Sequence, residues 1–308
     1  MDKEVYRKKR YSIVGNHSAV KICNWTRNSL TGKGVCYKEK FYGIKSHRCL
    51  QMTPAVAWCQ HACVFCWRPT EFTVSDSMKK VIIDEPQKII KDAINAQRKL
   101  LIGFKGNDKV DKKMLEEAFN PNQAAISLAG EPTLYPKIGE LIKEFHSQGF
   151  TTFLVTNGLN TNAIKNLKIL PTQLYVTLPA SNAKDYANIT KSNFGEKGFD
   201  KLLETIKALK QLKTRRVIRL TLVKGLNLKN AKEYAKIIKL GEPDFVEAKA
   251  YMHVGSSVER LKRENMPTHK EIKDFSQELA KELGWKVINE HEASRVCLIG
   301  KNNGLARI

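Results

Sequence analysis

The chain has 308 residues, and its 42% hydrophobic and 27% charged content is typical of a globular protein that can bury a large core. It contains no apolar run of the roughly 18 residues that a membrane-spanning helix requires, and no apolar segment of a secretory signal near its start. Its 53 Lys and Arg against 31 Asp and Glu leave a net charge of +22, which indicates a polyanionic partner such as nucleic acid; a surface that is basic without such a partner is the alternative.

The first 50 residues are basic and carry three evenly spaced cysteines. Twelve Lys and Arg stand there against three acidic residues, and the apolar residues show little periodicity, so we expect an irregular extension. The cysteines recur every thirteen residues: Cys23, Cys36 and Cys49. We expect a cytoplasmic protein, in which clustered cysteines indicate metal rather than disulfides. The spacing suits three loops converging on one cluster; a zinc site completed by His17 or His47, or unrelated buried thiols, are the alternatives.

The cysteines that follow have C-x3-C-x2-C spacing: Cys59, Cys63 and Cys66. Three thiolates on one tight loop can face a single cluster, and three protein ligands leave one coordination position open for a small molecule. A zinc knuckle completed by His61, or three packed cysteines, would be the alternatives. The seventh cysteine, Cys297, stands in an apolar strand-like run, where we expect a small buried hydrophobe.

From residue 49 onward the pattern alternates between strands and helices. We expect strands at 51–58, 124–128, 151–155, 174–178, 217–223 and 245–250. We expect helices at 84–101, 137–148, 163–167, 199–212, 229–240 and 270–283. Six such units predict an α/β fold with a partial, TIM-like (β/α)6 barrel, fewer units than a closed barrel has. We divide the chain into a cysteine-bearing N-terminal extension (1–48), a core barrel (49–284) and a short C-terminal α/β tail (285–308) with one or two edge strands.

Glycine or polar residues stand directly after the second, third and fourth of these strands: Gly130 and Glu131, Asn157, and Ser181. The carboxyl ends of parallel strands meet at one face of a barrel, so these residues are candidates for a binding site. For Gly130 and Glu131, an ordinary turn is the alternative. Along 245–250, alternation turns Glu247 and Lys249 to one face, the barrel interior, as a functional pair or as core electrostatics.

The loop sequence C-x3-C-x-Φ-C, with Phe65 in the aromatic slot, resembles the signature of the radical S-adenosylmethionine (SAM) superfamily. This resemblance implies that Cys59, Cys63 and Cys66 hold a 4Fe–4S cluster whose fourth iron binds SAM. It implies further that Gly130 and Glu131 correspond to the superfamily's Gly-Gly-Glu segment, which holds the SAM amino group, although Ala129 replaces the first glycine. Asn157 and Ser181 would then contact the SAM ribose and carboxylate.

The whole N-terminal half is similar to one family of this superfamily, the tRNA 4-demethylwyosine synthases of wybutosine biosynthesis. The matching words are Lys33-Gly34-Val35-Cys36-Tyr37-Lys38, Ser46-His47-Arg48-Cys49 and Cys66-Trp67-Arg68, and the similarity runs to beyond Gly255. The family implies a lyase that uses a SAM-derived 5′-deoxyadenosyl radical on N1-methylguanosine. This base stands 3′ of the anticodon (position 37) in phenylalanine tRNA, and two pyruvate carbons are added to form 4-demethylwyosine.

The resemblance also implies how pyruvate is held. Cys23, Cys36 and Cys49 would bind a second 4Fe–4S cluster, whose open iron could chelate the keto acid. Alternatively, Lys38 could form a Schiff base with pyruvate, because a second cation nearby lowers an amine pKa toward nucleophilicity. The alternative role for Lys38 is that of a surface lysine that contacts tRNA phosphate.

We place the tRNA footprint on the stretch 207–239, with eleven Lys and Arg against one acid, for which solvated helix faces are the alternative. Residues 3–10 are a second candidate and need not be ordered without RNA. Eukaryotic members of the family carry a flavodoxin-like domain for which this chain has no room. The resemblance therefore implies the archaeal form, a monomer with an external flavodoxin- or ferredoxin-like electron donor. Another radical SAM enzyme that modifies RNA or activates a protein, and a non-catalytic metal-bound RNA-binding protein, are the competing functions.

Overall fold

A computed structural model describes residues 2–75, 77–301 and 308, and its centre is one ten-stranded sheet in the order β1-β2-β3-β4-β5-β6-β7-β8-β10-β9. Six strands are parallel: β3 (Cys49–Thr53), β4 (Gln123–Ile126), β5 (Thr151–Thr156), β6 (Gln173–Thr177), β7 (Arg215–Leu222) and β8 (Phe245–Ala250). Antiparallel pairs extend both edges: β1 (Ser12–Val14) with β2 (Ser18–Val20), and β10 (Val296–Gly300) with β9 (Lys286–His291). The predicted partial barrel of six parallel strands and the edge strands of the tail are confirmed.

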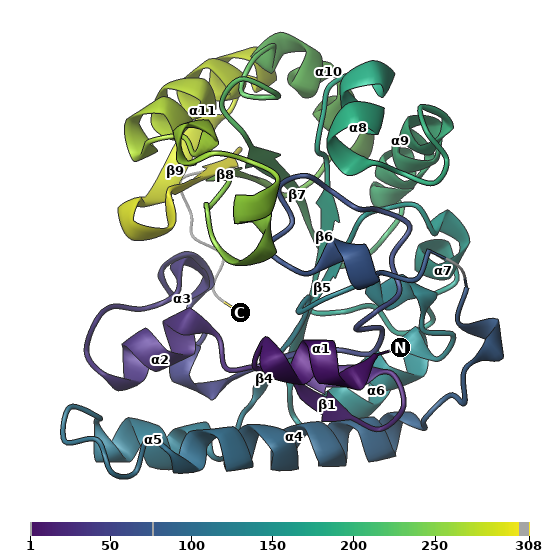
Figure 1. The fold of residues 1–308 in the computed structure, drawn as a ribbon. Helices are drawn as coiled ribbons and strands as arrows, with labels where there is room; N and C mark the ends of the chain where they lie inside the picture. Colours follow the sequence, from purple (N-terminus) through teal and green to yellow (C-terminus); the bar gives the residue numbers. More distant parts are fainter. Residues whose placement is uncertain (1, 76, 302–307) are drawn as a thin grey trace.

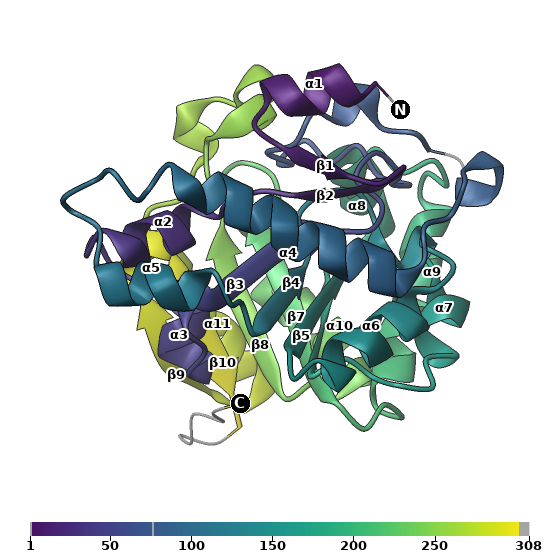
Figure 2. The same ribbon diagram turned by 90° about the horizontal axis from the view of Figure 1, so that it is seen from below.

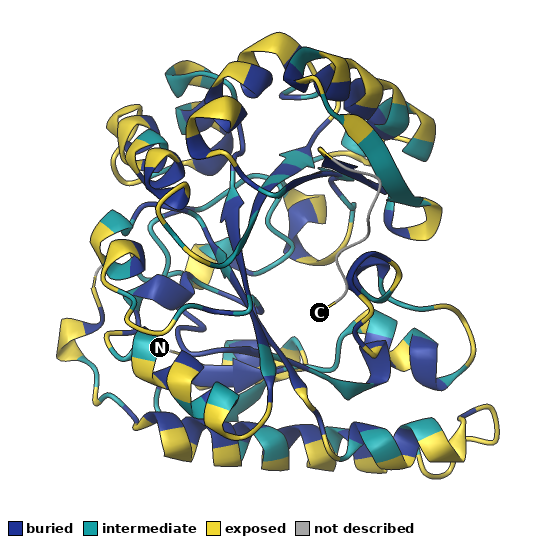
Figure 3. Cartoon of the chain, turned by 180° about the vertical axis from the view of Figure 1, so that it is seen from behind, coloured by how far each residue is buried: buried dark blue, intermediate teal, exposed yellow. Residues whose placement is uncertain are grey.

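Helices cover the outer face of this sheet (Figure 1). They are α4 (Pro86–Ile102), α5 (Lys112–Ala118), α6 (Ile138–Ser147), α7 (Thr161–Lys165), α8 (Ala183–Thr190), α9 (Lys197–Leu209), α10 (Ala231–Gly241) and α11 (His269–Leu283). Their apolar stripes face the strands and their polar faces point to solvent, as the burial colours show (Figure 3). Helices α5 and α8 are absent from the sequence-based prediction because each is short and carries few apolar residues.

The first parallel strand is shorter than predicted. Residues 51–58 were expected to form it, but β3 ends at Thr53 and the chain then turns toward the cysteine loop. Pro54 has no N–H to donate to a ladder, so the strand stops there. Within the loop that follows, Trp58 and Val74 pair with each other in an isolated parallel bridge.

Residues 2–50 form short helices and strands, so the expected irregular extension is wrong. They form α1 (Lys3–Lys8), β1, β2, α2 (Asn24–Leu30) and α3 (Tyr37–Tyr42). Helices α2 and α3 lie on the side that the open sheet leaves between β3 and β9 (Figure 1). Tyr37, Phe41 and Tyr42 of α3 form a buried cluster with Phe153 and Tyr175 of the strands, so α3 fills part of the barrel interior. The division at 48 and 285 stays a prediction. None of the described helices is long and apolar enough to cross a membrane.

Candidate active site

Cys59, Cys63 and Cys66 lie on a loop whose backbone N–H groups are bonded to two distant segments or to the loop itself. Cys59 N donates to Val74 O at 3.1 Å, and Cys66 N to Cys63 O at 3.0 Å. Helix α8 accepts two more bonds at its carboxyl end, from Ala62 N to Thr190 O and from Val64 N to Ile189 O, both at 2.9 Å. Helix α8, which sequence reasoning missed, therefore holds the centre of the cysteine loop.

The three thiols of this loop are half-buried, and their geometry argues against a single zinc ion. Burial raises the pKa of Cys59 to about 12, and burial also raises the pKa of Cys63, so a metal would have to displace their protons. Bonds of about 2.3 Å would place the sulfurs of a tetrahedral zinc site roughly 3.8 Å apart. Within the described residues, neither cysteine triplet brings its three sulfur atoms within 4.8 Å of one another. The described thiols are therefore not pre-arranged as a tetrahedral zinc site.

His61 does not complete a zinc knuckle in this structure. Its Nε2 lies 2.7 Å from the hydroxyl of Tyr186 on α8, and the side chain is buried. Burial lowers the pKa of His61 to about 3, so the ring is neutral at ordinary pH.

Asn157 lies beside the cysteine loop, as the order of the strands predicts. Its Nδ2 lies 3.9 Å from Cys59 Sγ and donates to Gln60 Oε1 at 3.3 Å. Phe65 packs against the main core, and Ser181 lies between β6 and α8. The roles of Asn157, Phe65 and Ser181 toward SAM stay predictions.

Glu131 is 2% exposed, and its carboxylate is used within the protein. One oxygen accepts bonds from Thr133 N at 3.1 Å and from the Thr133 and Thr156 hydroxyls at 2.7 Å, and the other accepts from Asn157 N at 2.7 Å. Burial raises the pKa of this carboxyl, although the hydrogen bonds act to lower it. Glu131 thus braces the ends of β4 and β5, and its role toward the SAM amino group stays a prediction.

The protein's own backbone requires a glycine at position 130. Its φ is +64°, and an added Cβ would lie 1.7 Å from Ala55 O and 2.6 Å from Trp58 O. The backbone that approaches this glycine is therefore the segment leading into the cysteine loop, where the sequence suggested a bound ligand.

The second triplet gathers from three element starts. Cys23 precedes α2, Cys36 precedes α3 and Cys49 begins β3. Burial, and to a smaller extent the charge of Cys23, raise the pKa of Cys36 to about 12. The zinc alternatives with a histidine ligand are disfavoured, because His17 bonds Pro54 O and Asp84 N, and His47 Nε2 lies 2.8 Å from Glu117.

Lys38 enters the barrel interior next to this triplet. The residue is 8% exposed, and its ammonium lies 4.3 Å from the ring centre of Phe153 and 4.8 Å from that of Tyr175. Among the described residues, Nζ of Lys38 has no hydrogen bond or ion pair. Burial lowers its pKa, and the charge of Arg219 lowers it further.

Lys249, the other lysine of the interior, is tied to the backbone. Its Nζ donates to Ser294 O at 2.8 Å, and burial lowers its pKa to about 8. Of the two lysines, Lys38 has the amine that is free to meet a substrate. No local sequence signal marks this difference, because Ser294 lies 45 residues from Lys249.

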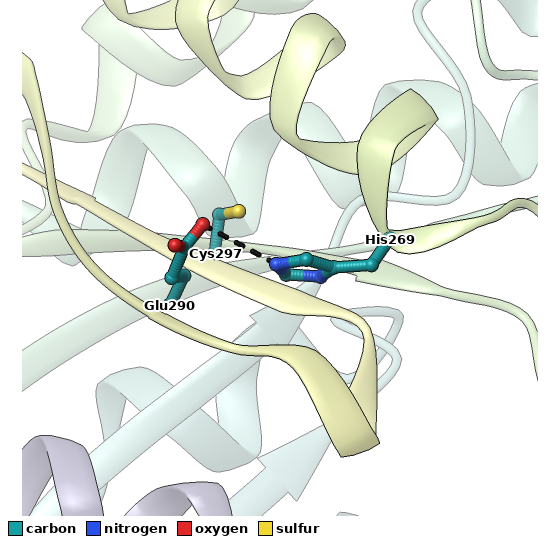
Figure 4. A group of neighbouring side chains, drawn as sticks. All are labelled: His269, Glu290 and Cys297. Atoms are coloured by element: carbon teal, nitrogen blue, oxygen red, sulfur yellow. Dashed lines mark hydrogen bonds and ion pairs between the residues drawn. The ribbon is translucent and has the colours of Figure 1, made fainter.

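A third group of metal-ligand residues is a network of ion pairs. His269 Nε2 lies 3.3 Å from one oxygen of Glu290, and Lys273 Nζ lies 3.1 Å from the other, with the buried Cys297 beside them (Figure 4). His269 and Lys273 occupy the two carboxylate oxygens, so an incoming cation would have to displace both side chains. Cys297 is buried in the core, as predicted.

Two family models match the chain, one for the radical SAM superfamily at residues 54–238 and one for wyosine base formation at residues 240–301. Together they cover both the cysteine loop and the region from the end of α10 to β10.

Curated relatives and solved structures agree with these matches. The SAM-dependent tRNA 4-demethylwyosine synthase of Pyrococcus horikoshii is 50% identical over 97% of this chain and 88% of its own length. The enzyme of the same name from Methanocaldococcus jannaschii is 42% identical over 97% and 96%. A structure of TYW1 with a lysine–pyruvate adduct bound covers 99% of this chain and 98% of its own, at 39% identity and a TM-score of 0.88. The chain therefore belongs to the family of SAM-dependent tRNA 4-demethylwyosine synthases within the radical SAM superfamily.

Proposed function

We propose that this protein converts N1-methylguanosine in the anticodon loop of phenylalanine tRNA, together with pyruvate, into 4-demethylwyosine. The observation that carries this proposal is the buried, unpaired amine of Lys38 beside the second cysteine triplet. Among the described residues, this amine meets two aromatic rings but no hydrogen-bond acceptor, and a substrate carbonyl and carboxylate would supply one.

Membership of the superfamily implies SAM and one 4Fe–4S cluster. We assign this cluster to Cys59, Cys63 and Cys66, with Asn157 beside the loop and Glu131 fixing the neighbouring strand ends. When bound, the cluster and SAM supply a one-electron cleavage that yields a radical able to take hydrogen from the methyl group of the base. The protein's own part is to hold the loop, orient SAM and exclude water from the barrel interior.

We assign pyruvate to the interior next to Cys23, Cys36 and Cys49. The neutral amine of Lys38 adds to the keto carbon and water leaves, so that a C=N bond replaces the C=O bond. Arg219 keeps a second positive charge nearby, which favours the neutral amine. A second 4Fe–4S cluster on this triplet would supply an open iron for the keto acid, as a Lewis acid and template.

Three further features belong to the proposal. The basic stretches 207–239 and 3–10 bind tRNA phosphates, an external flavodoxin- or ferredoxin-like protein donates the electron, and the protein acts as a monomer. The extrusion of a loop base costs little, because it is already nearly single-stranded.

The deciding experiment is mass spectrometry of tRNA that bears N1-methylguanosine after anaerobic incubation with protein, SAM, reductant and pyruvate. We expect the mass of the base to change by the amount that two added pyruvate carbons and ring closure require. We also expect about eight irons per chain, as two clusters require, and about four in variants that lack either triplet. Tightly bound zinc without SAM cleavage would contradict the proposal.

A further inference from the structure

The carbonyl side of the cysteine loop is held by one short segment from the other end of the chain, residues 255–260, which we call the clasp. Ser256 N donates to Trp67 O at 3.0 Å. Arg260 donates from Nε to Val64 O at 3.3 Å and from Nη2 to the carbonyls of Cys66 and Arg68. The clasp thus binds four carbonyls of residues 64–68, while α8 and Val74 hold N–H groups of the same loop.

The clasp packs closely against the cysteine loop. Gly255 has φ +61°, and an added Cβ would lie 2.2 Å from Trp67 O, so a side chain at this position would push the loop away. On the other side, Lys9 Nζ donates to Ser256 Oγ at 2.8 Å. Figure 2 shows the segment that contains the clasp lying beside α1, above the sheet.

Arg260 is suited to this place because its planar guanidinium donates in several fixed directions. It bonds three carbonyls of one loop, and a lysine, with a single charged nitrogen, could not reproduce this pattern. Its positive charge also lies next to the backbone of Cys66, a proposed cluster ligand. Positive charge and hydrogen bonds around a cluster favour its reduced form, which carries one more negative charge.

We propose that Arg260 is a positioning residue that fixes the cysteine loop and makes the cluster on that loop easier to reduce. The clasp lies within the region matched by the model for wyosine base formation, whereas the loop lies in the radical SAM region. The part of the chain that distinguishes this family thereby controls the cofactor site shared by the superfamily. This inference rests on the proposed assignment of the cluster to Cys59, Cys63 and Cys66.

The first test uses the iron-free protein and is independent of any cluster. Hydrogen exchange of the amides at 62–68 is compared between wild type, R260Q, R260K, G255A and the control K262Q, whose side chain is 82% exposed. We expect about tenfold faster exchange in R260Q, R260K and G255A, because the loop loses charged hydrogen bonds or is displaced, and no change in K262Q. Wild-type exchange in both Arg260 variants would overturn the positioning role.

The second test measures the midpoint potential of the reconstituted SAM-binding cluster by electron paramagnetic resonance. We expect a more negative potential in R260Q, because the positive charge at this position is lost. R260K keeps a positive charge there and K262Q leaves Arg260 unchanged, so both should have a potential near that of wild type. Equal potentials in R260Q and wild type would overturn the electrostatic role. Should wild type itself hold no reducible cluster, the proposed function fails, while the exchange experiment still decides whether Arg260 fixes the loop.

Discussion

Arg219 and Glu247 form an ion pair inside the barrel, with Arg219 Nη2 2.7 Å from Glu247 Oε2 and the glutamate side chain fully buried. The hydroxyls of Tyr37, Tyr42 and Tyr175 also donate to this carboxylate, at 3.2, 2.8 and 3.1 Å. Burial works against the ionised form, but the charges of Arg219 and Lys38 and the hydrogen bonds together outweigh it, so the pKa of Glu247 is held below its ordinary value. One carboxylate thus joins α3 to three strands of the sheet.

The substitution E247Q should lower the free energy of unfolding by about 3–5 kcal/mol, because it leaves Arg219 as a buried, unpaired charge. Denaturant unfolding of the iron-free protein measures this loss. The matched control is E264Q, because the Glu264 side chain is 76% exposed and its ion pair with Lys262 is 3.9 Å long. A loss in E247Q no larger than in E264Q would contradict the structural role of the pair.

The substitution K38A should abolish the adduct that borohydride traps between the protein and pyruvate, because Lys38 has the unpaired amine of the interior. Mass spectrometry of peptides locates the adduct. The control is K249R, which keeps a donor for Ser294 O but removes the competing amine. An adduct that persists in K38A and disappears in K249R would assign the chemistry to Lys249.

The substitution G130A should cost about 2–5 kcal/mol of stability, from an unfavourable positive φ and a clash with the backbone of Ala55. Gly149 supplies the comparison. Its φ is +76°, but an added Cβ would meet nothing within 4 Å, so G149A should cost only about 1–2 kcal/mol. Equal losses in urea unfolding would mean that the segment at Ala55 and Trp58 yields to a side chain.

Glu271 should make the stability of the protein depend on pH in the acid range. It stands in the first turn of α11, where its carboxylate accepts a hydrogen bond from the N–H of the N-cap Thr268 and lies 2.6 Å from Lys224. A hydrogen bond from Lys224 is the largest cause that lowers its pKa to about 2 from an ordinary 4.5. As the pH falls, Glu271 is therefore protonated at a higher pH in the unfolded state than in the folded state. The contribution of Glu271 is complete above pH 4.5 and is lost as the pH falls toward 2.

Unfolding curves of wild type and E271Q between pH 2 and pH 7 test this expectation. The difference in stability should be largest at neutral pH and should shrink as the pH falls. A difference that stays constant with pH would show that the glutamate acts only as a hydrogen-bond acceptor of the cap.

Local sequence determined the order of the repeating units and the candidate metal ligands. Helix 84–101 and strand 245–250 are confirmed at or near their predicted bounds, because their apolar residues repeat at the period of the element. The cysteine spacing identified both triplets, because ligand chemistry is carried by residue type and separation. Where a local rule opposed the apolar pattern, the predicted bounds were wrong. The strand predicted at 51–58 ends at Thr53, directly before Pro54.

The tertiary structure alone decided what surrounds those ligands. Arg260 bonds the carbonyl of Val64 across 196 positions of sequence, and α3 enters the barrel to bring Lys38 beside Arg219. Such contacts have no period along the chain, since they depend on how distant elements pack against one sheet. The sequence by itself therefore specified which residues have suitable chemistry, whereas packing decided which amine is free, which carboxylate is occupied and which arginine holds the cysteine loop.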